Sequence, residues 1–68
     1  MDKNKFSVRL KELRKSRSLS ARSLSLMIGC APSYISGIEN GRGLPSVEKL
    51  LAICKILNIR MADLFKYD

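Results

Sequence analysis

The 68-residue sequence contains no histidine and no tryptophan, and its only cysteines are Cys30 and Cys54. Without histidine or a Cys-X-X-Cys pair, the chain offers none of the usual zinc ligand sets. General acid–base and nucleophilic catalysis also lack their usual groups, because no serine has a plausible base and no carboxylates are suitably paired. We therefore expect neither an enzyme nor a bound metal or cofactor.

Long apolar runs are also missing. No window approaches the roughly 18 to 20 apolar residues that span a bilayer, and the N-terminus lacks the apolar stretch of a signal peptide. The two cysteines are accordingly expected to be reduced thiols and not a disulfide. These absences favour a soluble, cytoplasmic protein of one domain, residues 1–68, with no membrane partner and no small-molecule ligand.

Acidic residues are few beside the basic ones. Thirteen lysines and arginines oppose six acidic residues, which gives a net charge of +7. Between Met1 and Arg22, eight basic residues oppose Asp2 and Glu12, so eight minus two, or +6, lies in the first third. This imbalance fits a polyanionic partner, nucleic acid before membrane. The alternative is a basic face that serves only solubility, and both readings apply to Arg9, Lys11, Lys15 and Arg17.

The spacing of apolar residues predicts two helices in the first half of the chain. Phe6, Leu10 and Leu13 form one helical stripe, which predicts a helix from about Lys5 to Arg17. Ser20 is a good N-cap for a second helix over residues 21–28, and the glycine that follows is typical of a helix end.

Three more short helices are expected after residue 31. Pro32 suits the first position of a third helix, which Asn40 and the next glycine end. Ser46 caps a fourth helix that stops near Asn58, and residues 61–66 form a fifth. No segment alternates with the period of a strand, so the expected fold is all-α.

Two short helices joined by a tight glycine turn are the arrangement of a DNA-binding helix-turn-helix. Such patterns are weak alone, but here the similarity extends on both sides. Residues 13–65 resemble the Cro/C1-type, or XRE, family of bacterial and phage transcriptional regulators. The matching features are Leu13-Arg14, Leu19-Ser20, Leu24, Gly29, "YIS" with "IENG", Pro45-Ser46, the "LL" at 50–51, Leu57 and "ADLF".

The resemblance implies a compact five-helix, lambda-repressor-like domain. It implies a sequence-specific regulator, expected to be a repressor, that binds double-stranded operator DNA as a homodimer with its third helix in the major groove. It aligns Arg14 and Glu39 with a buried salt bridge between the first and third helices. The resemblance aligns Pro32, Ser33, Gly37, Asn40 and Arg42 with DNA contacts, and the full set of candidate DNA-binding residues is Ser20, Arg22, Pro32, Ser33, Tyr34, Ser36, Gly37, Asn40 and Arg42.

Several residues depart from the family pattern. Ala21 replaces a glutamine that supports base contact, and Ser25 replaces a packed alanine. Ala31 replaces the usual cap of the third helix, a loss worth ~1 kcal/mol. Gly37 lies in mid-helix, which costs roughly 0.5–1 kcal/mol relative to alanine. We expect thin base readout by Ser33, Tyr34 and Ser36, with affinity from phosphate contacts and specificity partly from DNA shape.

The apolar residues near the C-terminus exceed what a small core needs, which predicts a dimer surface on the fourth and fifth helices. Its candidates are Ile56, Met61, Phe65 and Tyr67. The alternative function is an antitoxin-like or other protein-interaction module on the same fold, with a protein partner. A DNA binder, unlike such a module, loses affinity for duplex DNA steeply as salt is raised.

Overall fold

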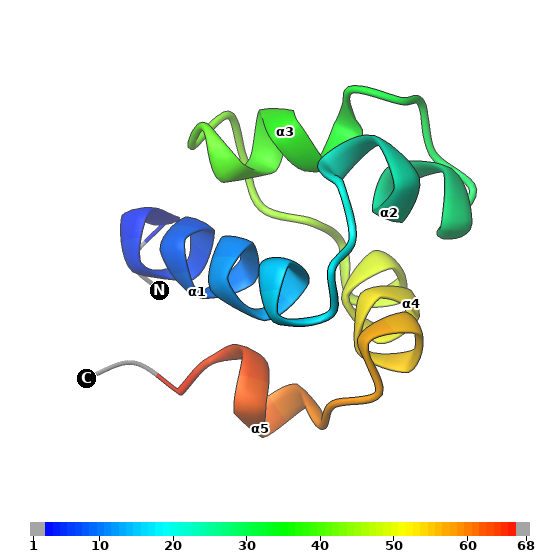
Figure 1. Ribbon diagram of the computed structural model, residues 1–68. Helices are drawn as coiled ribbons and strands as arrows, with labels where there is room; N and C mark the ends of the chain where they lie inside the picture. Colours follow the sequence, from blue (N-terminus) through cyan, green and yellow to red (C-terminus); the bar gives the residue numbers. More distant parts are fainter. Residues whose placement is uncertain (1–2, 67–68) are drawn as a thin grey trace.

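The computed structural model describes residues 3–66, which fold into five helices with no strand among them (Figure 1). This confirms the predicted all-α, five-helix architecture. No helix in residues 3–66 is long and apolar enough to cross a membrane. Tyr67, a predicted dimer residue, lies outside the described residues. The helices are α1 (Lys3–Ser16), α2 (Ala21–Met27), α3 (Tyr34–Glu39), α4 (Val47–Leu57) and α5 (Met61–Leu64).

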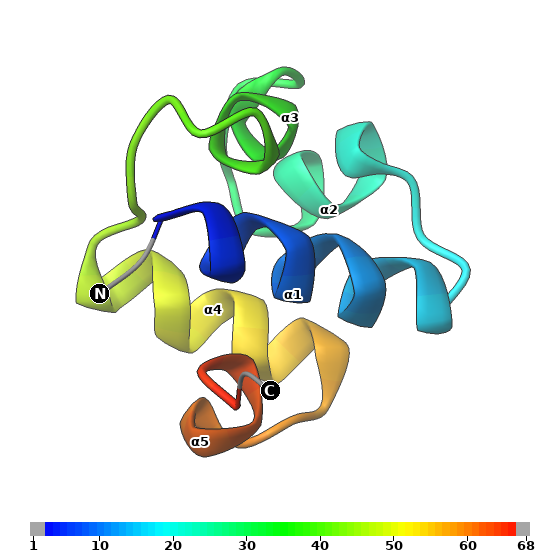
Figure 2. The ribbon, with the colours of Figure 1, turned by 90° about the vertical axis from the view of Figure 1, so that its left-hand side faces the viewer.

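Helix α1 runs through the middle of the molecule, with α2 and α3 on one side and α5 on the other (Figures 1 and 2). Every helix contributes to one apolar core around it. Burial of each such side chain stabilises the fold by roughly 1.5–3 kcal/mol. The fully buried apolar side chains are Phe6, Leu10, Leu24, Ile35, Ile53, Leu57 and Leu64.

The helix ends that sequence predicted from caps are confirmed. The Ser20 hydroxyl oxygen accepts a hydrogen bond from the Ser23 amide at 2.9 Å, at the start of α2. The Ser46 hydroxyl does the same for the Lys49 amide at 3.3 Å, at the start of α4. Asn58 ends α4 in the left-handed conformation, with φ of 55°, which asparagine tolerates better than most residues.

The start of α3 differs from the prediction. Pro32 was expected to be the first helical residue, but it and Ser33 form a turn that the Tyr34 amide closes on the Ala31 carbonyl at 3.0 Å. Proline presets a φ that suits a turn as well as a first helical turn, so the sequence did not distinguish the two. The predicted fifth helix is also too long, because it ends at Leu64 and not at residue 66. The other ends agree within one or two residues.

Ser25, which lies on the neighbouring helix α2, serves in place of the missing N-cap of α3. Its side chain is fully buried, and its hydroxyl donates to the Ala21 carbonyl at 2.7 Å. The same oxygen accepts from the Ile35 amide at 2.9 Å. That amide lies in the first turn of α3, where amides have no partner within the helix. The serine that replaces a family alanine therefore fixes the start of α3 against α2.

Replacing Ser25 with alanine should destabilise the domain by about 1–3 kcal/mol, because the buried Ile35 amide loses its acceptor. Urea unfolding followed by circular dichroism measures this change. The matched control is Ser23→Ala on the exposed side of the same helix, expected to stay within about 0.5 kcal/mol of the parent. Equal stabilities for the two variants would show that the bond to α3 contributes nothing.

Candidate nucleic-acid interface

Helix α3 lies at the surface with one side facing the core and the other facing solvent (Figure 1). Ile35 and Ile38 form its buried side. The turn before it, with Pro32 and Ser33, is exposed, as is Asn40 at its end. Tyr34, Ser36 and Gly37 are partly exposed along the helix. The structure thus brings most of the predicted DNA-binding residues onto one helix and its two ends.

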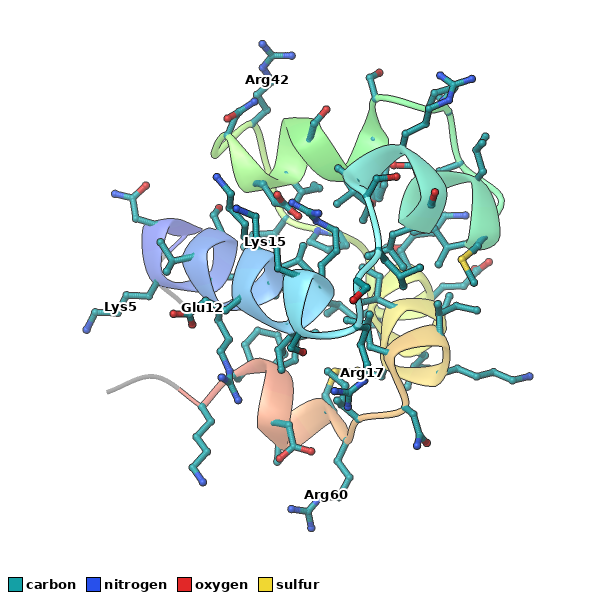
Figure 3. The ribbon with its side chains drawn as sticks, in the orientation of Figure 1. Lys5, Glu12, Lys15, Arg17, Arg42 and Arg60 are labelled. Atoms are coloured by element: carbon teal, nitrogen blue, oxygen red, sulfur yellow. The ribbon has the colours of Figure 1, made fainter. Side chains whose placement is uncertain are left out.

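Two exposed arginines border this surface. Arg42 follows the end of α3, and its side chain extends away from the body of the protein on the α3 side (Figure 3). Arg22 is exposed in the first turn of α2. Neither side chain is buried, so both guanidinium groups are accessible to an anionic partner.

Two of the predicted hydroxyl contacts are already engaged within the protein. The Ser20 hydroxyl caps α2 and donates to the Ser23 hydroxyl at 2.8 Å. The Ser36 hydroxyl donates to the Ser33 carbonyl at 3.0 Å, so its oxygen is left mainly as an acceptor. Partial burial raises the pKa of Tyr34, which keeps its phenol neutral and able to donate. This face therefore offers few side-chain hydrogen bonds to a partner.

A buried ion pair holds the far end of α3. Arg14 Nε lies 2.7 Å from Glu39 Oε2, and Arg14 Nη2 lies 2.8 Å from Glu39 Oε1. The third nitrogen donates to the Leu19 carbonyl at 2.7 Å. Only 9% of the Arg14 side chain and 7% of the Glu39 side chain are exposed. The hydrogen bond to Glu39 raises the pKa of Arg14 above its usual value. The arginine of this pair, which joins the first and third helices, therefore stays charged.

Two other arginines, Arg9 on α1 and Arg17 just after it, bind backbone carbonyls at the ends of helices. Arg9 Nε donates to the Asp63 carbonyl of α5 at 3.0 Å. Arg17 Nε donates to the Leu57 carbonyl, the last residue of α4, at 2.8 Å. The Leu57 carbonyl, the last of α4, has no partner within its own helix, whereas the Asp63 carbonyl also accepts from the Lys66 amide at 3.4 Å. In Figure 3, Arg17 lies on the side of α1 away from α3. Sequence reasoning left these arginines as either DNA contacts or a solvated face, and missed this role.

The remaining labelled charges show how the basic residues are divided. Lys15 lies on the side of α1 that faces α3, whereas Lys5 extends outward from the N-terminal end of α1 and Arg60 lies at the bottom of the view, beyond α5 (Figure 3). The concentration of charge in the first third of the sequence does not therefore translate into one basic face.

The residues predicted to form a dimer surface take part in the fold itself. Ile56, Met61 and Phe65 are partly buried and pack against the core. The ring of Phe65 stacks on Phe6, with centroids 5.4 Å apart. Much of their apolar surface is thus already covered within one copy of the chain.

Comparison with known proteins identifies this architecture. A helix-turn-helix family model matches residues 10–64, most of the chain. The chain belongs to this helix-turn-helix family, the XRE type, and carries the DNA-binding fold of its transcriptional regulators.

Particular solved structures are close to it. The restriction-modification controller protein C.AhdI from Aeromonas hydrophila superposes with a TM-score of 0.87 and 36% identity, over 94% of this chain and 97% of that one. The clp gene regulator ClgR from Corynebacterium glutamicum gives a TM-score of 0.84 and 27% identity, over 91% of this chain and 66% of that one.

Two curated relatives are longer than the matched region. The ImmF control region 10 kDa protein of Bacillus phage phi105 is 34% identical over 59 residues, 87% of this chain and 66% of that protein. The HTH-type transcriptional regulator RghRB of Bacillus subtilis strain 168 is 40% identical over 55 residues, 75% of this chain and 40% of that protein. The chain thus spans about two thirds of the first and two fifths of the second. These relatives are regulatory or control proteins.

Breaking the buried pair by Arg14→Glu or Glu39→Arg should destabilise the domain by about 3–5 kcal/mol, because each leaves an unpaired buried charge. The double exchange should recover only part of this loss. It restores the ion pair, but the hydrogen bond from position 14 to the Leu19 carbonyl stays broken. Thermal unfolding of the three variants measures it. The control is Arg60→Glu, which breaks the exposed pair with Asp63 at 3.5 Å and should cost no more than about 1 kcal/mol. If the destabilisation of the double variant equals the sum of the two single destabilisations, Arg14 and Glu39 are not coupled.

Proposed function

We propose that this regulator binds double-stranded DNA by placing α3 in the major groove. The observation that carries the proposal is how α3 is held. Ser25 fixes its first turn and Arg14 fixes its last residue, both from behind. The outward positions hold uncharged residues, namely Ser33, Tyr34, Ser36 and Gly37, and the helix lies at the surface (Figure 1). A major groove about 12 Å wide admits such a helix.

Phosphate contacts would supply most of the affinity. Arg42 beyond α3 and Arg22 at the start of α2 are exposed on either side of the motif, and Asn40 is exposed beside Arg42. Arginine side chains at such positions bind phosphate oxygens and set the register of the protein on the duplex. Lys15, on the α3 side of α1, adds to the same field (Figure 3).

Gly37 supports a close approach of the α3 backbone to DNA. A Cβ built there would meet only the Arg42 Cδ, at an ordinary 3.8 Å. Packing within the protein therefore does not require glycine at this position, although glycine weakens the helix. The absence of a side chain leaves room for a partner. With few polar side chains beside it, part of the specificity is expected from DNA shape and deformability.

The proposed regulator is a repressor that acts as a homodimer. A single module of this kind buries only about 600–1,000 Å² on DNA, which favours two copies on one operator. Two-fold symmetry then places the half-sites about 34 Å apart, one helical turn. Occupation of such a site overlapping a promoter blocks transcription without any chemistry by the protein.

Fluorescence anisotropy at several salt concentrations tests DNA binding directly, with the duplex upstream of the protein's own gene and a scrambled duplex as probes. We expect tighter binding to the upstream duplex and a linear fall in log affinity with log salt. Arg42→Gln should weaken binding to both duplexes and reduce the salt slope by about one. Arg60→Gln, exposed on the far side, is the matched control and should change neither. Weak, equal and salt-insensitive binding would instead favour the protein-interaction module.

Gly37→Ala should separate stability from DNA binding. The added methyl group meets no clash within the protein, so the free energy of unfolding should rise by about 0.5–1 kcal/mol. Affinity for the operator should fall about tenfold, the order of one mismatched base pair, because the methyl group faces the groove. Urea unfolding and anisotropy on the same sample check both. A stabilised variant with unchanged affinity would show that the backbone does not approach DNA at this position.

A further inference from the structure

The outward segment formed by α3 and the turn before it lacks the side chains that read bases by paired hydrogen bonds. Residues 31–39 contain no arginine, lysine, asparagine or glutamine, which are the side chains that bond guanine or adenine in a bidentate way in the major groove. The one charged residue is Glu39. Arg14 binds both of its carboxylate oxygens, and its side chain is only 7% exposed. Base recognition by this segment therefore depends on other groups.

The hydroxyl groups of the segment select weakly among bases. Ser36 donates its proton to the Ser33 carbonyl at 3.0 Å. The Ser33 hydroxyl is on an exposed residue and does not cap α3. A hydroxyl both donates and accepts, so it can pair with several different base edges. Two serines therefore do not define one base pair.

The rest of the outward surface at the start of α3 is apolar or bare backbone. Ala31 and Pro32 are exposed, and Tyr34 is partly exposed while also packing against the core. Gly37 lies three residues after Tyr34, so the two are neighbours on the surface of the helix. A Cβ at Gly37 would meet only the Arg42 Cδ, at 3.8 Å, so the Tyr34 ring borders a position without a side chain. The turn and α3 lie together at the top of the view in Figure 1.

Thymine carries the apolar group that the major groove presents. Its C5-methyl group projects there, and apolar side chains contact it without any donor or acceptor. Such a contact matches a segment that has rings and little hydrogen-bonding capacity. Burying one methyl-sized group is worth about fourfold in affinity. Several such contacts therefore suffice for a preference among duplexes.

We propose that Pro32 and Tyr34 select DNA by contact with thymine methyl groups, so that the duplexes bound best carry A·T pairs where α3 enters the groove. This inference rests on the proposed function, in which α3 lies in the major groove. It supplies a base preference that phosphate contacts from Arg22 and Arg42 do not carry. It is also distinct from recognition of DNA shape, because it acts at individual contacted thymines.

Replacing thymine with deoxyuridine tests the proposal, because it removes the methyl group and keeps the base-pair hydrogen bonds. The probe is the tightest-binding duplex that the parent chain selects from a random-sequence library. Fluorescence anisotropy gives its affinity with each thymine replaced in turn, and we expect a loss of about fourfold at each contacted thymine.

The matched base replacement is 7-deazaadenine for adenine, which removes the N7 acceptor from the same groove. It should cost less affinity than deoxyuridine does. A larger loss with 7-deazaadenine means that hydrogen bonds read the bases, and it overturns the proposal.

Two variants assign the methyl contacts to residues. Pro32→Ser replaces an exposed ring, and it should abolish the deoxyuridine loss at one thymine. Tyr34→Ser should do so at another. Arg42→Gln is the control, which should weaken binding but leave the ratio of affinities for the thymine and deoxyuridine probes unchanged. Circular dichroism confirms that the variants are folded. Deoxyuridine losses that persist in both serine variants come from the DNA itself and overturn the contact.

Failure of this inference is distinguishable from failure of DNA binding. If the parent chain enriches no duplex from the library, the proposed DNA-binding function is wrong, and the base preference falls with it. If the chain enriches a duplex but binds its deoxyuridine form equally well, the DNA-binding function stands and only the methyl contact is overturned.

Discussion

The Arg14 guanidinium holds three parts of the chain together while almost completely withdrawn from water. Two of its nitrogens bind the carboxylate of Glu39 at the end of α3, and the third binds the carbonyl of Leu19 between α1 and α2. A buried charge without its partner is expensive, so α3 can dock on α1 in only one register without a large penalty. Ser25 imposes a second condition at the other end of α3. Helix α3 has only six residues, so its orientation depends more on these two polar contacts than on the helix itself.

The basic character of the chain has two physical roles. Arg9 and Arg17 complete the C-terminal ends of α5 and α4, where carbonyls need donors. In a small domain with five helices, such ends are a large share of the backbone, and Arg9 on α1 and Arg17 just after it each reach one of them. The charge that remains for DNA is carried by fewer residues than the net charge of +7 suggests. Arg42 after the end of α3 and Lys15 on the α3 side of α1 are among them (Figure 3), and Arg22 is exposed in the first turn of α2.

Local signals in the sequence predicted most of the helices, and long-range contacts decided the rest. Ser20 and Ser46 cap amides three residues away, so their role is readable from the sequence. The bond from Ser25 reaches Ile35, ten residues on, and that of Arg9 reaches Asp63, 54 residues on. No local pattern reports such contacts. The Arg14–Glu39 pair was anticipated only through the family resemblance. The expected dimer residues stay a prediction: Ile56, Met61 and Phe65 are partly buried against the core, and apolar character alone does not distinguish core from interface.

In the proposed function, α3 and its flanking arginines form the DNA-facing surface. This surface can be mapped by NMR, from the backbone amide chemical shifts of the labelled domain as operator duplex is added. We predict the largest changes at residues 32–37, at Arg42 and in the first turn of α2, with little change in α5. Changes concentrated in α5 and the start of α1, with α3 unaffected, would rule out α3 as the DNA-facing helix.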